Sequence, residues 1–153
     1  MQQSTTPTPS SSLTFTVLGK PAPQGSKRHV GRGVMVESSK RCKPWRQDVR
    51  HTALDLRPEG WYANMDAAIS ISVVFVFARP KNHFRTNGQL KPSAPTYCTA
   101  RIGDVDKLAR SILDSLAGVL FAADEQVINL IAQKRYANDR EQPCAIITVS
   151  AVS

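Results

Sequence analysis

Residues 101–127 read RIGDVDKLARSILDSLAGVLFAADEQV, and this stretch decides most of the fold. From Val105 onwards, apolar side chains recur at offsets of 3, 4, 7, 8 and 11 residues, a spacing that places them on one face of an α-helix. The pattern predicts an amphipathic helix over residues 105–117, and Gly118 is a suitable residue at which to end it. After a turn, the apolar residues of VINLIAQKRY, 127–136, predict a strand.

Working outward, strand and helix patterns alternate along the chain. We predict strands at residues 13–19, 66–79, 127–136 and 144–152, and a second helix that Pro44 opens and Pro58 stops. This order predicts an α+β or mixed α/β fold, with about four strands in one sheet covered by two helices. Residues 13–153 are expected to form a single domain, whereas residues 1–12, almost all Ser, Thr, Pro and Gln, are expected to be a disordered tail.

The charge of the chain is divided unevenly. Residues 1–103 hold 15 Lys and Arg against 5 Asp and Glu, whereas residues 104–153 hold 5 against 7, and the whole chain has a formal charge of +8. The cations gather in two segments, 19–50 and 79–101, where Pro and Gly predict loops without regular structure at residues 20–33 and 80–103. A basic excess of this kind is typical of proteins that bind nucleic acid, although a well-solvated surface explains it about equally well.

The two basic segments supply the candidate DNA contacts. Phe84 and Tyr97 lie among the cations and offer flat surfaces on which unpaired bases could stack, unless they pack against their own loop. The candidate contacts to the DNA backbone are Lys27, Arg28, Lys40, Arg41, Lys43, Arg46, Lys81 and Arg85.

The acidic residues gather at the predicted helix. Asp104 precedes the apolar run and suits an extended N-cap position, from which its carboxylate can turn towards Asp106 in the first helical turn. A chain reversal at Gly118 could bring Asp124 back alongside. Three carboxylates are a suitable ligand set for Mg²⁺, which activates phosphodiester hydrolysis.

A purely structural interpretation of the same acids stays open. Asp104 and Asp106 also stabilise a helix by capping and by their charge at its positive end. Asp124 could be an ordinary turn residue, and Arg110 could pair with Asp106 or Asp114, each four residues away.

Composition argues against several other classes of protein. No apolar run approaches the length of a membrane span, and the first residues lack the features of an export signal, so we expect no membrane and a cytoplasmic location. Three widely spaced cysteines fit reduced thiols. The string GKPAPQGSK lacks the order of a phosphate-binding loop, which makes a nucleotide-using enzyme an unfavoured alternative.

The block GDVDKLARSILDSLAGVLFAADEQV, residues 103–127, resembles the RusA family of Holliday junction resolvases, often carried by phages and prophages. An Asp-x-Asp pair, an apolar helix and Asp-x-Gln-Val about twenty residues later carry the resemblance together. It implies that Asp104, Asp106 and Asp124 bind Mg²⁺.

The chain departs from the family pattern at two positions. Family members typically have two acids before x-Gln-Val, but Ala123 takes the first place here. Arg110 takes the place of a catalytic lysine, and an arginine can clamp a phosphate but cannot release a proton. Lys107 lies close by in sequence and is the candidate substitute.

The resemblance implies a Mg²⁺-dependent endodeoxyribonuclease that resolves Holliday junctions and other branched DNA in recombination and repair. It also implies a homodimer, whose two-fold symmetry suits paired, symmetric nicks in a four-way junction. A non-catalytic basic DNA-binding module, in which the acids only stabilise the helix, is the alternative.

Overall fold

The computed structural model describes residues 12–25, 27–29, 35–37, 40–59 and 67–152, with residues 27–29 and 35–37 described by their backbone alone. The predicted tail at residues 1–12 therefore lies outside the described residues, except for Ser12. Within the described ranges, no helix is long and apolar enough to cross a membrane.

A mixed sheet of four strands forms the centre of the molecule, in the order β1-β6-β4-β5. β6 pairs antiparallel with both β1 and β4, whereas β4 and β5 run parallel. The strands are β1 (Leu13–Leu18), β4 (Ala68–Phe77), β5 (Val127–Tyr136) and β6 (Cys144–Val152). Each corresponds to a predicted strand, and the predicted α+β class is confirmed.

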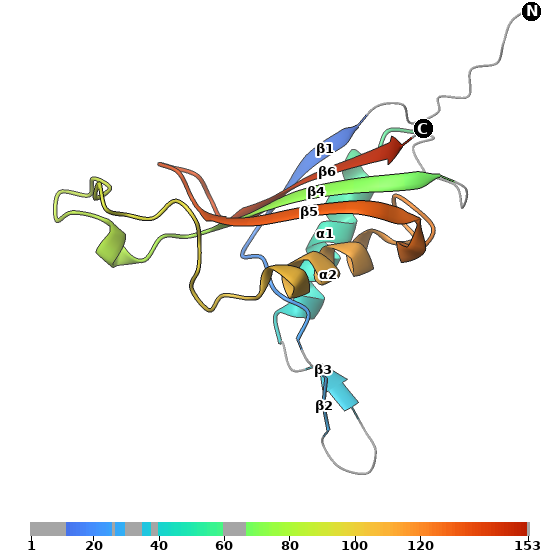
Figure 1. Cartoon of the computed structure of the whole chain (residues 1–153), viewed down its shortest axis with the longest axis horizontal. Helices are drawn as coiled ribbons and strands as arrows, with labels where there is room; N and C mark the ends of the chain where they lie inside the picture. Colours follow the sequence, from blue (N-terminus) through green and yellow to red (C-terminus); the bar gives the residue numbers. More distant parts are fainter. Residues whose placement is uncertain (1–11, 26, 30–34, 38–39, 60–66, 153) are drawn as a thin grey trace, which may run out of the picture.

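Two helices, α1 (Cys42–Leu56) and α2 (Val105–Leu116), cover one face of this sheet (Figure 1). β4 explains the choice of face, because its side chains alternate between buried Ile, Val and Phe on the helical side and half-buried Ser and Val on the other. The helices add their own apolar stripes to the same buried cluster, mainly Trp45, Val49, Ala53, Leu108, Ile112 and Leu116. The core therefore lies between the sheet and the two predicted helices.

The basic segment that follows β1 contains more regular structure than its sequence predicts. β2 (Lys27–His29) pairs antiparallel with β3 (Met35–Glu37), and Figure 1 shows this hairpin projecting beyond the helices. The prediction of about a dozen residues without regular structure is wrong here. The prolines that motivated it end at Pro23, before β2 begins, and no residue of either short strand forbids pairing.

The connection between β4 and β5 carries the acidic residues. Parallel neighbours need a crossover, and the chain supplies it as a loop from residue 78, helix α2, and a short 3-10 turn, η2 (Asp124–Gln126). The loop also contains a 3-10 turn, η1 (Lys81–His83).

Arg79 fastens the base of this loop to the sheet. Its Nε donates to the carbonyl of Ala137 at 2.8 Å, and its Nη1 donates to the carbonyl of Pro95 at 2.7 Å. The guanidinium also lies over the ring of Tyr136, at 5.4 Å from the ring centre. The loop is therefore anchored at its base while its basic side chains, including Lys81 and Arg85, remain exposed.

Candidate active site

Asp104 and Asp106 stand at the N-terminus of α2. Asp104 is the N-cap residue with extended backbone angles, φ −70° and ψ 142°, as predicted, but its side chain makes no capping hydrogen bond. Its carboxylate is 76% exposed and lies 3.9 Å from Nζ of Lys107. Asp106 is exposed and makes no hydrogen bond or ion pair with other residues that the structure describes. Both carboxylates are therefore accessible to a ligand.

Gly103 sets the direction in which the chain enters α2. Its φ of +139° lies in a region that residues with a side chain rarely adopt, and a Cβ added there would lie 3.1 Å from Cβ and Cγ of Pro23. The carbonyl of Gly103 accepts a hydrogen bond from Nζ of Lys134, on β5, at 2.9 Å. Lys134 thus helps to hold the peptide that precedes Asp104, a role that no local pattern in the sequence indicates.

Asp124 is held in η2 by a buried glutamine. The side-chain oxygen of Gln126 accepts hydrogen bonds from the backbone N–H of Ala122 at 2.7 Å and of Ala123 at 2.9 Å. Its amide nitrogen donates to the carbonyl of Ala67, just before β4, at 3.0 Å. Gln126 therefore fixes the turn that carries Asp124 against the sheet, which gives a physical role to the Gln of the Asp-x-Gln-Val motif.

Arg110 connects this turn to α2. Its Nη1 donates to Oδ2 of Asp124 at 2.8 Å and lies 3.8 Å from Oδ1 of Asp114. The predicted pairing with Asp114 is therefore present, but the shorter contact joins two elements that are separate in sequence. The position that a lysine holds in the family pattern is thus occupied by a side chain that already neutralises one of the three aspartates.

The three aspartates lie at or beside α2 without surrounding one point. In the described ranges, no group of three His, Cys, Asp or Glu side chains is arranged to hold a metal ion. Asp104 and Asp106 are at the start of α2, and Asp124 faces Arg110 one helical turn further along. The donor chemistry nevertheless fits Mg²⁺, which prefers carboxylate oxygens and often uses only one or two of them together with substrate phosphates.

The candidate DNA contacts fall on three parts of the molecule. Lys27 and Arg28 are in β2, for which the structure describes the backbone alone. Lys81 and Arg85 are exposed on the long loop. The other four, Lys40, Arg41, Lys43 and Arg46, lie at the start of α1.

A groove of about 650 Å³ separates the start of α1 from α2. Lys43, Arg46 and Arg50 line it from α1, and Asp114 lines it from α2. The groove therefore brings cations of one helix next to the helix that carries the acids.

The two loop aromatics differ in surroundings. Phe84 is partly exposed and forms a β-bridge with Leu90 within its own loop. Tyr97 is more exposed and bridges to Arg135 at the end of β5. Both keep surface that a base could contact, and the predictions made for them stay predictions.

Comparison with known proteins adds independent evidence about the family of this chain. A family model described as endodeoxyribonuclease RusA matches residues 19–149, which include the basic segments, α2 and all three aspartates. A search of curated proteins found no match. Since the family model covers most of the chain and its fold is the expected one, the chain belongs to the RusA family of endodeoxyribonucleases, enzymes that act as Holliday junction resolvases.

Proposed function

We propose that this nuclease depends on Mg²⁺ and resolves Holliday junctions and other branched DNA by paired, symmetric nicks. One observation carries the proposal. Asp104 and Asp106 stand exposed at the positive end of α2, and the Asp104 side chain makes no capping hydrogen bond. A third carboxylate, that of Asp124, is held beside the same helix by Arg110. The same helix contributes Asp114 to a groove that α1 lines with cations.

Asp104, Asp106 and Asp124 are the residues that would hold the ion. When bound, Mg²⁺ supplies Lewis-acid polarisation of the scissile phosphate and neutralises charge on the leaving oxygen. Asp104 and Asp106 would be accessible to the ion, because both are exposed and the Asp104 side chain makes no capping hydrogen bond. Asp124 would join this ligand set by giving up its contact with Arg110.

Arg110 and Lys107 have different proposed roles. Released from Asp124, the guanidinium of Arg110 can clamp the scissile phosphate and stabilise the charge that develops on it. Lys107 lies 3.9 Å from Asp104 and is half exposed, so its ammonium can reach the leaving oxygen and protonate it.

DNA enters along the basic surface. Lys43 and Arg46 line the groove beside α2, and Lys40 and Arg41 lie just before α1. Further proposed contacts are Lys27 and Arg28 in the hairpin and Lys81 and Arg85 in the loop. These contacts are to phosphates, so they select the shape of a branch rather than its sequence. Phe84 or Tyr97 can then contact bases that are unpaired at the branch point.

A homodimer completes the proposal, and β5 offers the surface for it. β5 is an edge strand, and among the described residues the loop pairs only with its end. There the N–H of Tyr136 donates to the carbonyl of Thr96 at 2.9 Å, and the N–H of Cys98 donates to the carbonyl of Lys134 at 3.5 Å. The uncovered part exposes Ile128 by 64% and Ile131 by 58%, and residues 126–133 carry no charge. A second copy can therefore pair along this edge without the repulsion expected elsewhere on a basic chain.

Light scattering coupled to size exclusion tests the dimer. Ile131→Lys is expected to shift the mass from dimer to monomer, since two copies would bury the new charge. Leu54→Lys is the matched control, because Leu54 is also an exposed apolar residue but lies on α1. A monomeric parent, or loss of the dimer only in the control, contradicts the use of this edge.

The activity itself is tested with a synthetic four-way junction and a linear duplex of the same sequence. With Mg²⁺ we expect nicks at symmetric positions in opposed strands of the junction, little cleavage of the duplex, and none in EDTA. Junction binding without metal-dependent cleavage, by protein whose circular dichroism shows an intact fold, would instead favour a non-catalytic module.

A further inference from the structure

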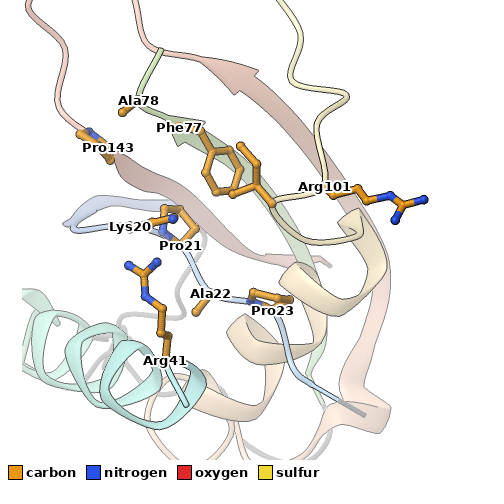
Figure 2. A pocket seen from close by; sticks show the side chains of 10 residues that line it. Lys20, Pro21, Ala22, Pro23, Arg41, Phe77, Ala78, Arg101 and Pro143 are labelled. Carbon is orange, nitrogen blue, oxygen red and sulfur yellow. The ribbon is translucent and has the colours of Figure 1, made fainter. Parts of the chain in front are cut away.

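A cavity of about 360 Å³ lies beside the start of α2 and has no role in the proposed chemistry (Figure 2). Its walls include the apolar side chains of Pro21, Phe77, Ile102 and Pro143. Among the residues that line it, three are basic and none is acidic. An apolar chamber with a cationic rim is suited to a ligand that has both a ring system and a negative charge.

Two of the cations meet at one side of the cavity. Lys20 follows β1 and Arg41 precedes α1, yet Figure 2 shows both side chains beside Pro21, whereas Arg101 points away from the chamber on the opposite side. Lys20 and Arg41 are exposed, and neither forms an ion pair with an acid in the described part of the chain. Their charges are therefore available to an anion that enters from this side.

The cavity lies close to the start of α2, where Asp104 and Asp106 stand. Ile102 lines it and stands two residues before Asp104, a span of at most about 7 Å. Pro23, another lining residue, packs against Gly103, and the N–H of Gln24 donates to the carbonyl of Lys107 at 2.9 Å. A short stretch of one DNA strand can thus reach both the aspartates and the cavity.

We infer that this cavity binds one unpaired nucleotide of branched DNA, next to the bond that is cut. The base occupies the apolar chamber, and its phosphate lies between Lys20 and Arg41. The volume is near the lower end of the roughly 300–1,000 Å³ typical of pockets for small organic ligands, which suits a single nucleotide. Extrusion of a base costs least where it is already unpaired, so the cavity would favour branch points over continuous duplex.

This inference rests on the proposed function and deepens it, because it assigns branch selectivity to a defined chamber. Phosphate contacts along α1 and the loop bind any DNA of suitable shape, whereas the cavity requires a base that has left the stack. A free nucleotide has the same chemistry, and a titration with thymidine 5′-monophosphate distinguishes the two sources. Saturable binding of this probe in the micromolar range would contradict a site that depends on the attached strand.

The decisive experiment places 2-aminopurine, a fluorescent base, at the nucleotides that flank the branch point of a four-way junction. Binding is measured in EDTA, so that no strand is cut. Transfer of the base from the stack to the chamber is expected to raise its fluorescence several-fold at one position. The same label in the middle of an arm is expected to show no change.

Two variants with different chemistry probe the chamber. Lys20→Gln combined with Arg41→Gln removes the rim charges, and Ala78→Leu adds bulk at a lining residue that is otherwise exposed. Both are expected to abolish the fluorescence rise and to weaken junction binding about tenfold. Lys91→Gln combined with Arg140→Gln removes two exposed charges that do not line the cavity, and is expected to keep the rise.

The outcomes separate this inference from the proposed function. A parent protein that cuts junctions with Mg²⁺ but gives no fluorescence change at any branch position overturns the inference alone. An equal rise in the parent and in both cavity variants, with melting temperatures unchanged, overturns it as well. A rise that only the cavity variants lose supports it, even if the pattern of nicks differs from the paired one.

Discussion

Helices α1 and α2 lie on the same face of the sheet but differ in the charges at their N-termini. α2 has Asp106 in its first turn and Asp104 as its N-cap residue, whereas α1 has no acid in its first turn and carries Lys43, Arg46 and Arg50. Both helices pack through an apolar stripe, so the core does not require this difference. It fits the proposed roles of the two helices, in which α1 attracts the polyanion and α2 supplies the acids that act on it.

The two helices are also joined. Arg50 of α1 donates to the carbonyls of Ser115 and Ala117 at 3.3 and 3.4 Å, and Arg57 donates to the carbonyl of Val119 at 2.8 Å. These carbonyls are at and beyond the C-terminus of α2, where cations compensate for the helix dipole. Variants should therefore separate binding from cleavage only where they spare these contacts.

The largest separation is expected for Asp106→Asn. Loss of one carboxylate weakens metal binding, and because metal stabilisation supplies several kcal/mol, single-turnover cleavage should fall about 10³-fold. Junction affinity should stay the same or rise, because a negative charge near phosphates is removed. Asp114→Asn, on the same helix, is the control and should cut at nearly the parental rate. An Asp106→Asn protein as fast as the parent would falsify the metal assignment.

Arg110→Met should have the next largest effect on cleavage. It removes the clamp proposed for the phosphate, and loss of one such donor costs about 10²-fold in rate. Unfolding should change little, because exposed ion pairs contribute only about 0–1 kcal/mol. Arg110→Lys keeps the charge and should recover most of the rate. Equal losses in the two variants, measured under single turnover, would argue against a role for charge at this position.

Gly103→Ala tests whether the entry into α2 controls the acids. Its φ of +139° and the 3.1 Å approach to Pro23 should cost about 1–3 kcal/mol in unfolding free energy and misplace Asp104. Gly88→Ala is the control, since φ there is also positive, at +85°, but nothing lies within 4 Å of the added Cβ. The measurements are denaturant unfolding of the two variants and their cleavage rates under conditions where both remain folded. Identical behaviour of the two alanine variants would show that the packing against Pro23 is unimportant.

Lys43→Gln combined with Arg46→Gln should change binding rather than chemistry. Each lost phosphate contact lowers the slope of log affinity against log salt by about 0.9, and the affinity at low salt falls accordingly. The rate at saturating DNA should remain close to that of the parent. Gln47→Ala, an exposed neutral neighbour, should leave the slope unchanged. Fluorescence anisotropy over a range of salt concentrations measures the affinity and its salt slope for each variant.

The smallest effect concerns an ion pair that belongs to neither helix. Hydrogen bonds from Arg135 lower the pKa of the Glu141 carboxyl below its ordinary value of 4.5, with contacts of 2.6 and 2.9 Å. A lowered pKa stabilises the fold above pH 4.5, and this contribution is lost as the pH falls through the folded-state value. Glu141→Gln should therefore cost about 1 kcal/mol near pH 7 and less in acid, with cleavage unaffected. A constant difference in unfolding free energy down to pH 3 would contradict this.

The sequence predicts those parts of the molecule that depend on local periodicity. α2 and the four main strands follow from apolar spacing, because burial of one face is enough to define them. The β2–β3 hairpin does not follow, since short strands with little apolar character leave no such pattern. The sequence predicts Asp104 as the N-cap residue, but local reasoning could not show that its side chain makes no capping hydrogen bond.

The candidate site shows the same limit more sharply. The aspartates themselves could be named from spacing and family pattern. The contacts of Lys134 with Gly103, of Gln126 with Ala67 and of Arg110 with Asp124 join residues that only the folded chain brings together. They hold the backbone before Asp104, the turn that carries Asp124 and the Asp124 side chain, and no local pattern contains that information.

Anomalous scattering from crystals grown with Mn²⁺ in place of Mg²⁺ tests the central claim most directly. We expect a peak about 2.1–2.3 Å from carboxylate oxygens of Asp104 and Asp106, with Asp124 turned from Arg110 towards the same ion, directly or through a water molecule. Peaks that avoid all three aspartates, in protein that still cleaves junctions, would contradict the assignment of these residues as the metal-binding site.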